Sequence, residues 1–305
     1  MLQGTFHPNQ EIKSPFLTSK KVNLYIKRLD LIHPTAGGNK YFKLLYNLKE
    51  AEIRSHKTIL TFGGAYSNHI YSTAAACQAL GLRSIGIIRG EAGKQLSPTL
   101  EYAKECGMSL HYMDRETYRN KQQAEVVENL RRQFGSFYLI PEGGTNKLAI
   151  KGCMEILREE DHRMDYIGAA IGTGGTLTGL IASARASQTV LGISSLKGEF
   201  IHKEIACLLE SHAIEPKAKY ELFTDYHFGG YAKYKQELIE FMREFTDQNG
   251  IPLDPIYTGK LFYGIYDLIK KDYFHEHASI LLIHSGGLQG IEGFNMRHQE
   301  NLRSS

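Results

Sequence analysis

The sequence of 305 residues predicts an α/β fold, and three observations lead to it. Short apolar runs rich in β-branched residues alternate along the chain with helical stretches, which is the pattern of β-α-β units. Most of these runs are apolar throughout, as in parallel strands that helices cover on both faces. The 30 glycines include six Gly-Gly pairs, mainly where a predicted strand passes into a predicted helix. Ligands of open parallel sheets bind beside such junctions, so we expect a binding site there.

The elements follow one another from residue 40 to residue 284. In chain order, strands are predicted where apolar and β-branched residues gather, at 58–62, 84–88, 110–113, 137–140, 166–171, 222–224 and 280–284. Helices are predicted between and around these strands, at 40–54, 67–80, 97–105, 115–134, 148–160, 176–186, 231–249 and 259–274. No low-complexity linker and no repeat of fixed period divides the chain, so composition alone draws no domain boundary.

The composition narrows the class of protein. The 36 basic and 33 acidic residues nearly balance and form no dense basic run, which argues against a nucleic-acid partner. No apolar stretch approaches the ~18 residues of a membrane helix, and the polar N-terminus lacks the apolar core of a signal peptide. The four cysteines are far apart and form no CxxC pair, so reduced thiols and a cytoplasmic location are expected. The 13 histidines form no recognised ligand pattern, and we predict no metal site.

The strongest local motif is the segment Gly172–Gly179, which follows the predicted strand 166–171. Glycines let backbone N–H groups turn inward, threonine hydroxyls add donors, and the next helix directs its positive end at the loop. The segment therefore predicts a phosphate-binding loop. No Lys-Ser/Thr follows it as in a Walker loop, and Leu177 takes the place of the third glycine of the dinucleotide motif. The alternative is a tight strand-to-helix turn without a ligand.

Two further junctions carry chemically useful side chains. Lys40 follows a Gly-Gly pair in the first turn of a predicted helix, where the helix dipole disfavours its charge and would lower its pKa. The alternatives are an ordinary solvated lysine at this position, or a nucleophile at Lys43, one turn further on. Ser67 stands in the N-cap position of the next predicted helix, where it either only caps or also binds an anion such as a carboxylate. The residues alone leave both choices open.

Six motifs occur in a fixed order along the chain. They are Asn39–Leu44 (NKYFKL), Gly64–His69 (GAYSNH), Pro141–Asn146 (PEGGTN), Gly172–Gly179 (GTGGTLTG), Leu253–Lys260 (LDPIYTGK) and His284–Gly287 (HSGG). Together they resemble the pyridoxal-phosphate enzymes of the 1-aminocyclopropane-1-carboxylate deaminase/D-cysteine desulfhydrase family, within the tryptophan synthase β-like fold. The resemblance runs from near Pro15 to near Gly290 and so spans most of the chain.

The resemblance implies an architecture. We expect two open, twisted, mostly parallel sheets flanked by helices, which is pyridoxal-phosphate fold type II. A larger cofactor-binding domain would comprise residues 1–53 and 160–305, and a smaller α/β domain would comprise residues 54–159. The active site would lie in the cleft between them, and the enzyme would be a homodimer.

The resemblance also implies roles at the cofactor, pyridoxal 5′-phosphate. Lys40 would bind it covalently and then act as the base on the substrate α-carbon, while a structural role is implied for Lys43. Asn68 would hydrogen-bond the phenolic oxygen of the cofactor, and Ser285 would hydrogen-bond its pyridine nitrogen. The phosphate would lie on the loop formed by Gly172, Thr173, Gly174, Gly175 and Thr176.

On the substrate side, the resemblance implies that Ser67 and the adjacent N–H groups hold the substrate carboxylate. Tyr231 and Tyr257 match substrate-facing tyrosines. The predicted catalytic residues are Lys40, Ser67 and Tyr257, and the predicted substrate-binding residues are Ser67, Asn68, His69, Tyr231, Tyr257 and Thr258.

Two positions bear on the reaction. Deaminases of the family typically carry glutamate after the tyrosine of Tyr-x-Gly-Lys and leucine before the last Gly-Gly, whereas desulfhydrase-like members carry threonine at both. This chain has Thr258 and Ser285. A hydroxyl at Ser285 can hydrogen-bond the pyridine nitrogen without forcing its protonation, which suits the loss of a β-thiolate. The prediction is α,β-elimination from a small D-amino acid such as D-cysteine, giving a 2-oxo acid, ammonia and sulfide.

Three alternatives stay open: a 1-aminocyclopropane-1-carboxylate deaminase, a serine dehydratase or racemase of the same fold, and a non-catalytic phosphometabolite-binding protein. The chain also departs from the family pattern. Tyr66 and Tyr71 stand where the family usually has glutamine and often has arginine, and Phe42 replaces a commonly charged residue. Tyr66 lies beside the predicted carboxylate site, so it bears on the substrate and not on the cofactor. The segment from Gln188 to Glu210 is expected to be a trimmed connection.

Overall fold

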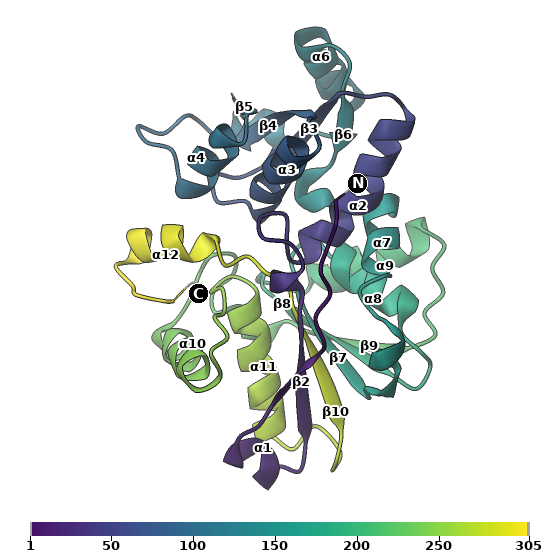
Figure 1. Cartoon of the computed structure of the whole chain (residues 1–305), viewed down its shortest axis with the longest axis vertical. Helices are drawn as coiled ribbons and strands as arrows, with labels where there is room; N and C mark the ends of the chain where they lie inside the picture. Colours follow the sequence, from purple (N-terminus) through teal and green to yellow (C-terminus); the bar gives the residue numbers. More distant parts are fainter. Residues whose placement is uncertain (1, 304–305) are drawn as a thin grey trace.

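The computed structural model describes residues 2–303, which form two sheets (Figure 1). The strands of the six-stranded sheet, in spatial order, are β1 (Gln10–Ile12), β2 (Asn23–Arg28), β10 (Ser279–His284), β7 (Tyr166–Ile171), β8 (Thr189–Ser194) and β9 (Lys219–Phe223). Those of the four-stranded sheet are β5 (Met108–Met113), β4 (Arg83–Arg89), β3 (Thr58–Gly63) and β6 (Tyr138–Ile140). β1 runs antiparallel to β2, and the other neighbouring strands of the described chain are parallel. The predicted α/β fold with two mostly parallel sheets is confirmed.

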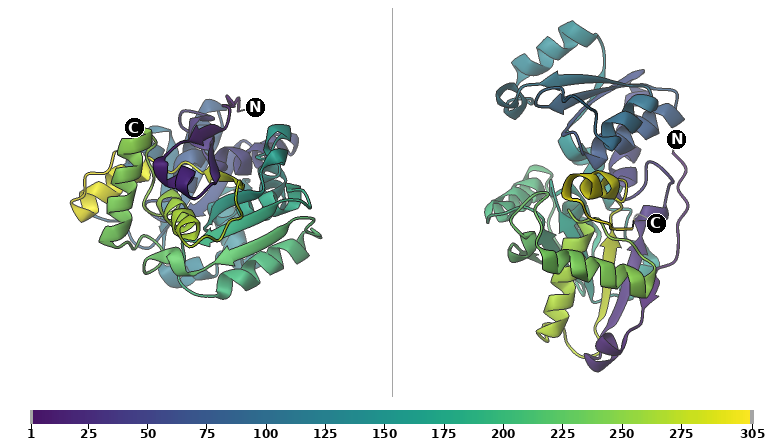
Figure 2. Two further views of the ribbon diagram at one scale, coloured as in Figure 1. Left: turned by 90° about the horizontal axis from the view of Figure 1, so that it is seen from below. Right: turned by 90° about the vertical axis from the view of Figure 1, so that its left-hand side faces the viewer.

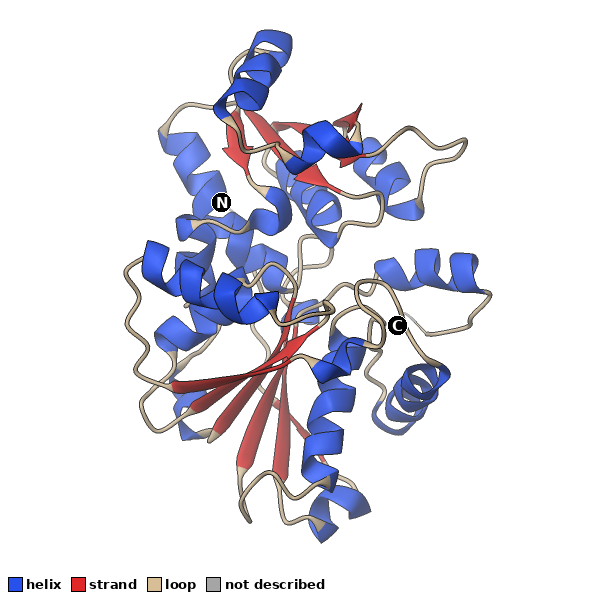
Figure 3. Ribbon diagram, turned by 180° about the vertical axis from the view of Figure 1, so that it is seen from behind, coloured by secondary structure: helices blue, strands red, loops and turns tan. Residues whose placement is uncertain are grey.

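Helices cover both faces of the six-stranded sheet, as Figure 3 shows. The helices on one face are α10 (Gln236–Asn249) and α11 (Thr258–Lys270), and those on the other include α8 (Gly175–Ser183) and α9 (Phe200–Ser211). In β10, Leu282 packs into the core on the α11 side, whereas its neighbours Leu281 and Ile283 pack into the core on the α8 side. Because successive residues of a strand face opposite sides, a strand covered twice must be apolar throughout.

The four-stranded sheet is covered in the same way. Its helices are α3 (Asn68–Ala79) and α4 (Pro98–Glu105) on one face and α5 (Arg115–Arg119) and α6 (Ala124–Phe134) on the other. Ile88 of β4 packs with Leu100 of α4, and the adjacent Ile87 packs with Leu130 of α6. This sheet therefore has two small apolar cores of its own.

Two helices join the sheets. α2 (Asn39–Ile53) and α7 (Lys147–Cys153) lie side by side, and a Cβ added to Gly152 would lie 2.0 Å from the carbonyl oxygen of Phe42. Only glycine allows this close approach of the two backbones. One apolar cluster runs from β3 and β6 through α2 to β7 and β8. The sheets are thus connected by a packed layer as well as by the chain itself.

The remaining helices lie at the two ends of the chain. They are α1 (Pro15–Ser19) and α12 (Gly290–His298), and single 3-10 turns occur at 29–31, 142–144, 159–163 and 225–227. α12 lies beside α4, in the region between the two sheets (Figures 1 and 2). Within residues 2–303, no helix combines the length and the apolar character needed to cross a bilayer.

All seven predicted strands are present, but the six-stranded sheet contains three further strands, β1, β2 and β8. The interpretation of residues 188–210 as a trimmed connection is wrong, because this segment contains β8 and most of α9. β8 lies between β7 and β9, and Ile201, Ile205 and Leu209 of α9 are buried against the sheet.

Three predicted helices differ most from the structure in their bounds. The predicted helix 115–134 is two helices, because the chain turns after α5 and starts again at α6. The predicted helix 148–160 already ends at Cys153, and the predicted helix 231–249 begins only at Gln236. The residues before Gln236 form a loop that starts with two glycines of positive φ, Gly229 and Gly230. The domain boundaries near residues 53 and 160 stay predictions.

Candidate active site

Loops that follow the carboxyl ends of strands from both sheets meet beside the start of α2. The backbone N–H of Asn39 donates to the carbonyl oxygen of Ser285 at 3.1 Å, and its side-chain amide donates to Thr176 Oγ1 at 2.8 Å. On the other side, the amide of Gln289 donates to Asn68 Oδ1 at 2.7 Å. The structure thus brings together the predicted lysine, phosphate-loop, Ser67 and Ser285 segments.

Lys40 is the second residue of α2, and its Nζ donates to Asn39 Oδ1 at 3.0 Å. Burial, together with the neighbouring charge of Lys43, lowers the pKa of Lys40 to about 7, although Cys153 and Asp254 act in the opposite direction. A lysine amine with such a pKa is substantially unprotonated near neutral pH. Lys40 is therefore suited to act as a nucleophile and as a base.

The loop after β7 has the features of a phosphate-binding site. Gly174 has a φ of +81°, and a Cβ added to Gly175 would lie 2.9 Å from the side chain of Thr145. The N-terminus of α8 begins at this loop and carries a partial positive charge. The amine of Lys43 lies close by, bonded to the carbonyl of Gly143 and to the hydroxyls of Thr145 and Thr173 at 2.9, 3.0 and 3.2 Å. An amine, hydroxyls and a helix N-terminus form a donor set that fits a phosphate dianion.

The start of α3 presents three predicted site residues. Ser67 caps the helix, since its Oγ accepts from the N–H of Ile70 at 3.3 Å. The Oδ1 of Asn68 accepts from Gln289, so its Nδ2 faces Gly287. A Cβ added to Gly287 would lie 2.6 Å from this nitrogen. The orientation of the amide is therefore fixed with its donor group toward the loop after β10. His69 is buried beneath this turn.

Tyr231 and Tyr257 form a pair, with their ring centroids 6.3 Å apart. Tyr257 lies against the phosphate loop, because a Cβ added to Gly172 would be 3.0 Å from its ring. Burial, together with Tyr231 and Asp254, holds the pKa of Tyr257 well above its usual value. Its phenol therefore keeps its proton and can donate a hydrogen bond.

Thr258 has a different place from the one predicted. It is fully buried, and its hydroxyl donates to Asp254 Oδ2 at 2.7 Å and accepts from the N–H of Asp254 at 2.7 Å. The same carboxylate also accepts from the N–H groups of Ile256 and Tyr257. Thr258 thus fixes the turn before α11, and its hydroxyl has no free donor for a substrate.

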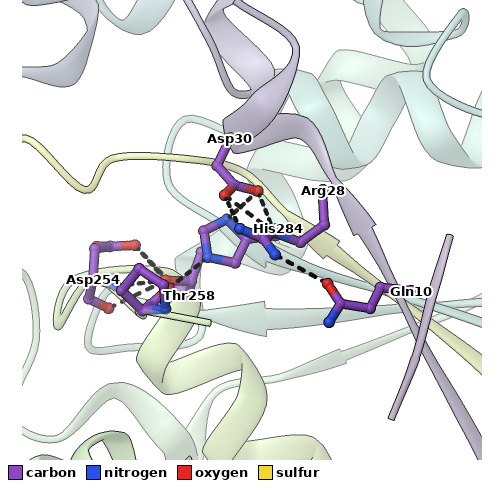
Figure 4. A network of polar contacts seen from close by, with 7 residues as sticks. Gln10, Arg28, Asp30, Asp254, Thr258 and His284 are labelled. Atoms are coloured by element: carbon purple, nitrogen blue, oxygen red, sulfur yellow. Dashed lines mark hydrogen bonds and ion pairs between the residues drawn. The ribbon is translucent and has the colours of Figure 1, made fainter. Parts of the chain in front are cut away.

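A buried polar network, shown in Figure 4, supports the end of β10 next to Ser285. Asp30 lies 2.7 Å from the guanidinium of Arg28 and 3.2 Å from Nδ1 of His284. The other ring nitrogen of His284, Nε2, lies 2.8 Å from the carbonyl oxygen of Pro252. Burial alone would raise the pKa of Asp30, but His284 and Arg28 outweigh it and hold this pKa well below the usual value. The network fixes the backbone from which Ser285 extends.

Sequence reasoning did not find several residues that support this site. Gln289 and Asp30 act through contacts with residues far away in the sequence, and no local pattern marks them. His284 opens the HSGG motif, but the motif does not show its contact with Asp30. Asp254 is the exception. It stands in an Asp-Pro pair, which is a turn signal that the sequence does show, and its Oδ1 accepts from the N–H of Ile256 two residues on.

Lys260 holds the loop that carries Tyr231. It is fully buried, and its Nζ donates to the carbonyl oxygens of His227 and Gly230, both at 2.8 Å. Three positive-φ residues in this loop, Phe228, Gly229 and Gly230, turn those carbonyls inward. A buried amine thus takes the place of regular secondary structure in positioning the segment before Tyr231.

In the natural chain, Lys260 is expected to make the free energy of unfolding increase with pH above pH 8, and Lys260→Met should reduce this increase. Burial lowers the pKa of Lys260 from 10.5 to about 8, so the unfolded chain binds more protons than the folded chain between these two values. The free energy of unfolding therefore rises with pH in this window, with a contribution from Lys260 of up to about 3 kcal/mol. Urea unfolding at about pH 7 and about pH 10 measures the slope. The exposed Lys270→Met is the control, and an unchanged slope in Lys260→Met would contradict the expectation.

Known proteins resemble this chain over most of its length. A Pyrococcus abyssi protein, named as a candidate 1-aminocyclopropane-1-carboxylate deaminase, is 34% identical over 285 residues, which are 88% of this chain and 86% of the relative. An Arabidopsis thaliana protein, named bifunctional D-cysteine desulfhydrase/1-aminocyclopropane-1-carboxylate deaminase, mitochondrial, is 29% identical over 293 residues, with 88% of this chain and 73% of the relative covered. A solved structure of a homologue of 1-aminocyclopropane-1-carboxylate (ACC) deaminase matches with a TM-score of 0.79 and 31% identity, and the match covers 95% of this chain and 91% of that chain.

A family model described as "Pyridoxal-phosphate dependent enzyme" matches residues 5–286. This span contains Lys40, the loop after β7 and Ser285, which are the residues that the structure brings together. The donor set beside Lys43 fits the phosphate of that cofactor, and the amine of Lys40 is suited to bind it. The chain belongs to the family of pyridoxal-phosphate dependent enzymes.

Proposed function

We propose that this pyridoxal-phosphate-dependent enzyme catalyses α,β-elimination from a small D-amino acid, with D-cysteine as the preferred substrate. Water is consumed, and the products are a 2-oxo acid, ammonia and sulfide. The observation that carries this proposal is the hydroxyl of Ser285, which follows β10 beside the start of α2. A neutral hydroxyl partner at the pyridine nitrogen suits a reaction in which a β-thiolate leaves and little negative charge has to be stored.

When bound, pyridoxal phosphate withdraws electrons from the substrate α-carbon and makes the α-proton acidic. The residues of the chain would then act as follows. The loop after β7 and Lys43 hold the phosphate, while Asn68 presents its Nδ2 to the phenolic oxygen. The N–H groups at the start of α3, with Ser67, bind the substrate carboxylate. Lys40 receives the α-proton on its Nζ, since its lowered pKa leaves this amine free near neutral pH.

Tyr257 is the group that we assign to the leaving thiolate. Its phenol stays protonated and lies beside the phosphate loop, and Tyr231 packs against its ring. A hydrogen bond from this phenol would stabilise the negative charge that develops on the departing sulfur. Tyr231 completes the proposed substrate side, His69 lies buried beneath it, and Thr258 supports it through Asp254.

The second candidate is ring-opening deamination of 1-aminocyclopropane-1-carboxylate. The names of the Pyrococcus abyssi protein and of the solved homologue favour it, and the name of the Arabidopsis relative joins both activities. The same residues would bind the cofactor and the substrate carboxylate in either reaction. The two candidates differ in what leaves the β-carbon, which a product assay detects directly.

The decisive experiment supplies purified holoenzyme with D-cysteine, L-cysteine, D-serine, L-serine and 1-aminocyclopropane-1-carboxylate in parallel. Release of sulfide and pyruvate from D-cysteine, at a higher kcat/KM than any product from the other four, supports the proposal. A larger release of 2-oxobutyrate from the cyclopropane substrate would establish the deaminase instead. Serine enantiomers that interconvert, or lose water faster than D-cysteine loses sulfide, would establish a racemase or dehydratase. A colourless protein that binds no cofactor would contradict all of these.

Replacing Lys43 with methionine is expected to weaken the binding of pyridoxal 5′-phosphate to the apoenzyme by about 10- to 100-fold, the value of one charge-assisted hydrogen bond. The reason is that Lys43 is the buried cation beside the phosphate loop. Titration of the apoenzyme with the cofactor, followed by absorbance, measures the change. Lys271→Met, which removes an exposed lysine that pairs with Asp267, is the matched control. Equal affinities in the two variants would place the phosphate elsewhere.

We also propose a homodimer in the cytoplasm. The homodimer rests on the family resemblance, and the cytoplasmic location rests on the widely spaced, unpaired cysteines of the chain. Light scattering of the purified holoenzyme tests the first point, and a mass equal to one chain of 34.4 kDa would contradict it.

A further inference from the structure

The two ring nitrogens of His69 are not equivalent. Nε2 lies 2.8 Å from Oγ1 of Thr61, and the same hydroxyl donates to the carbonyl oxygen of Ile140 at 2.8 Å. A hydroxyl has one hydrogen, which this second bond uses, so Thr61 can only accept from the ring. Nε2 must therefore carry the ring proton, and Nδ1 carries a lone pair. The fold selects this tautomer before any ligand binds.

Nδ1 of His69 is a buried acceptor without a donor. The side chain is 1% exposed, and within residues 2–303 this nitrogen has no hydrogen-bond partner. A buried acceptor left unsatisfied costs about 1–3 kcal/mol, so it usually has a function or a partner in another state of the protein. Gly144 forms the adjacent wall, since a Cβ added there would lie 3.3 Å from Nδ1. No side chain at position 144 therefore blocks the approach of a donor.

Two amines lie close enough to His69 for their charges to affect it. Burial is the main cause that holds the pKa of His69 well below its usual value, and Lys40 and Lys43 lower it further, in that order. The amine of Lys43 is bonded to Gly143, Thr145 and Thr173 beside the phosphate loop, so it is not the donor that Nδ1 of His69 lacks.

The amine of Lys40 has one partner within the described chain, Oδ1 of Asn39. When this amine is protonated, it carries three hydrogens, and two of them lack an acceptor. The site thus contains one acceptor that needs a donor and one amine that gains donors when it takes up a proton.

We propose that Nδ1 of His69 is the second hydrogen-bond acceptor for the protonated amine of Lys40, beside Asn39. The proton from the substrate α-carbon moves to Nζ of Lys40, and His69 accepts a hydrogen bond from that ammonium without taking the proton itself. His69 is then a positioning residue that stabilises Lys40 between proton uptake and release. This inference rests on the proposed role of Lys40 as the lysine that binds the cofactor and serves as the base.

The charged and titratable groups that face Lys40 come from four elements. They are Lys43 on its own helix, Cys153 on α7, Asp254 before α11 and His69 on α3. Lys43 disfavours the ammonium form of Lys40, whereas Cys153 and Asp254 favour it. A change confined to His69 leaves the other three in place, so a comparison of His69 variants isolates its contribution.

The test compares His69→Asn with His69→Gln. The Asn oxygen reaches the position of Nδ1 and keeps the proposed acceptor, while the longer Gln reaches the position of Nε2 and keeps only the bond to Thr61. The measured quantity is the rate at which the apoenzyme recovers the absorbance of the lysine-bound cofactor, as a function of pH. Only the unprotonated amine reacts, so this rate has an inflection at the pKa of Lys40, expected at about 7 in the natural chain.

We expect the inflection of His69→Gln to fall by about one pH unit, because the ammonium form loses an acceptor. The inflection of His69→Asn should stay near that of the natural chain. Identical inflections in the two variants, or a shift only in His69→Asn, would overturn the proposal. Circular dichroism of each variant shows whether it folds.

Thr61→Val gives a second test that leaves His69 in place. Without the Thr61 oxygen, the ring proton can move to Nδ1, so this variant should shift the inflection in the same direction as His69→Gln. An inflection at the natural value would overturn the proposal. A failure of the proposed function looks different, since the absorbance band would then be absent from the natural chain or would persist in Lys40→Ala.

Discussion

Lys40→Ala is expected to lower kcat by at least about 10³-fold and to remove the absorbance band of the lysine-bound cofactor. One side chain supplies both the amine that binds the cofactor covalently and the base that takes the α-proton, so its loss removes two steps together. The amine is set in place by Gly38 at the start of α2 and by its bond to Asn39. Initial rates with D-cysteine and an absorbance spectrum of the reconstituted protein measure the two effects.

The control for this prediction is Lys49→Ala, which removes an exposed lysine from the same helix. It should retain the band and the rate of the natural chain. Lys40→Arg is informative as well, because it keeps the positive charge but has no free amine near neutral pH. We expect it to be as inactive as Lys40→Ala. A Lys40→Ala protein that still shows the band of a lysine-bound cofactor would assign the cofactor to another lysine.

Gly38→Ala is expected to lower the free energy of unfolding by about 3 kcal/mol or more and to abolish activity. Gly38 has a φ of +69°, and an added Cβ would lie 2.1 Å from the carbonyl oxygen of Ser285. The same carbonyl accepts the N–H of Asn39, so the two segments cannot separate without losing a hydrogen bond. Because one segment carries Lys40 and the other carries Ser285, their separation disturbs both ends of the cofactor site.

Gly81→Ala is the matched control for Gly38→Ala. Gly81 has a φ of +64°, almost the same as that of Gly38, but no atom lies within 4 Å of an added Cβ. It should therefore cost only the conformational penalty of a left-handed alanine, about 1 kcal/mol. Urea unfolding of both variants separates the two contributions. Equal losses of stability would show that the contact with Ser285 carries no weight.

The sequence predicts those strands whose apolar pattern and ends are determined by residues within the strand and next to it. β7 has the predicted bounds, because both of its faces are buried by apolar residues and the glycine-rich loop begins directly after it at Gly172. β2 is harder to recognise, since Lys27 belongs to a buried ion pair with Asp161 on a distant turn. β8 is buried at every residue after Thr189, and its apolar run is the local pattern of a strand that helices cover on both faces.

The candidate site shows the same division. Glycine-rich loops after strands and an N-cap serine are visible in the sequence because their geometry is determined within a few residues. The partners of those residues are not. Gln289 contacts Asn68 across 221 positions, and Asp30, in the turn after β2, contacts His284 at the end of β10. For Thr258, the motif predicts that the residue lies near the site. It does not predict that the hydroxyl donates to the buried carboxylate of Asp254 and so has no hydrogen left for a substrate.

The bond between Asn68 and Gln289 joins a helix on the four-stranded sheet to the segment that follows the six-stranded sheet. A second contact joins the same parts, because the guanidinium of Arg297 on α12 lies 5.2 Å from the ring centroid of Tyr66. Any widening of the gap between the sheets must break both contacts and turn the amide of Asn68 away from its site. Cofactor affinity and the closed arrangement of the two halves are therefore thermodynamically linked, and each must change the other by the same free energy.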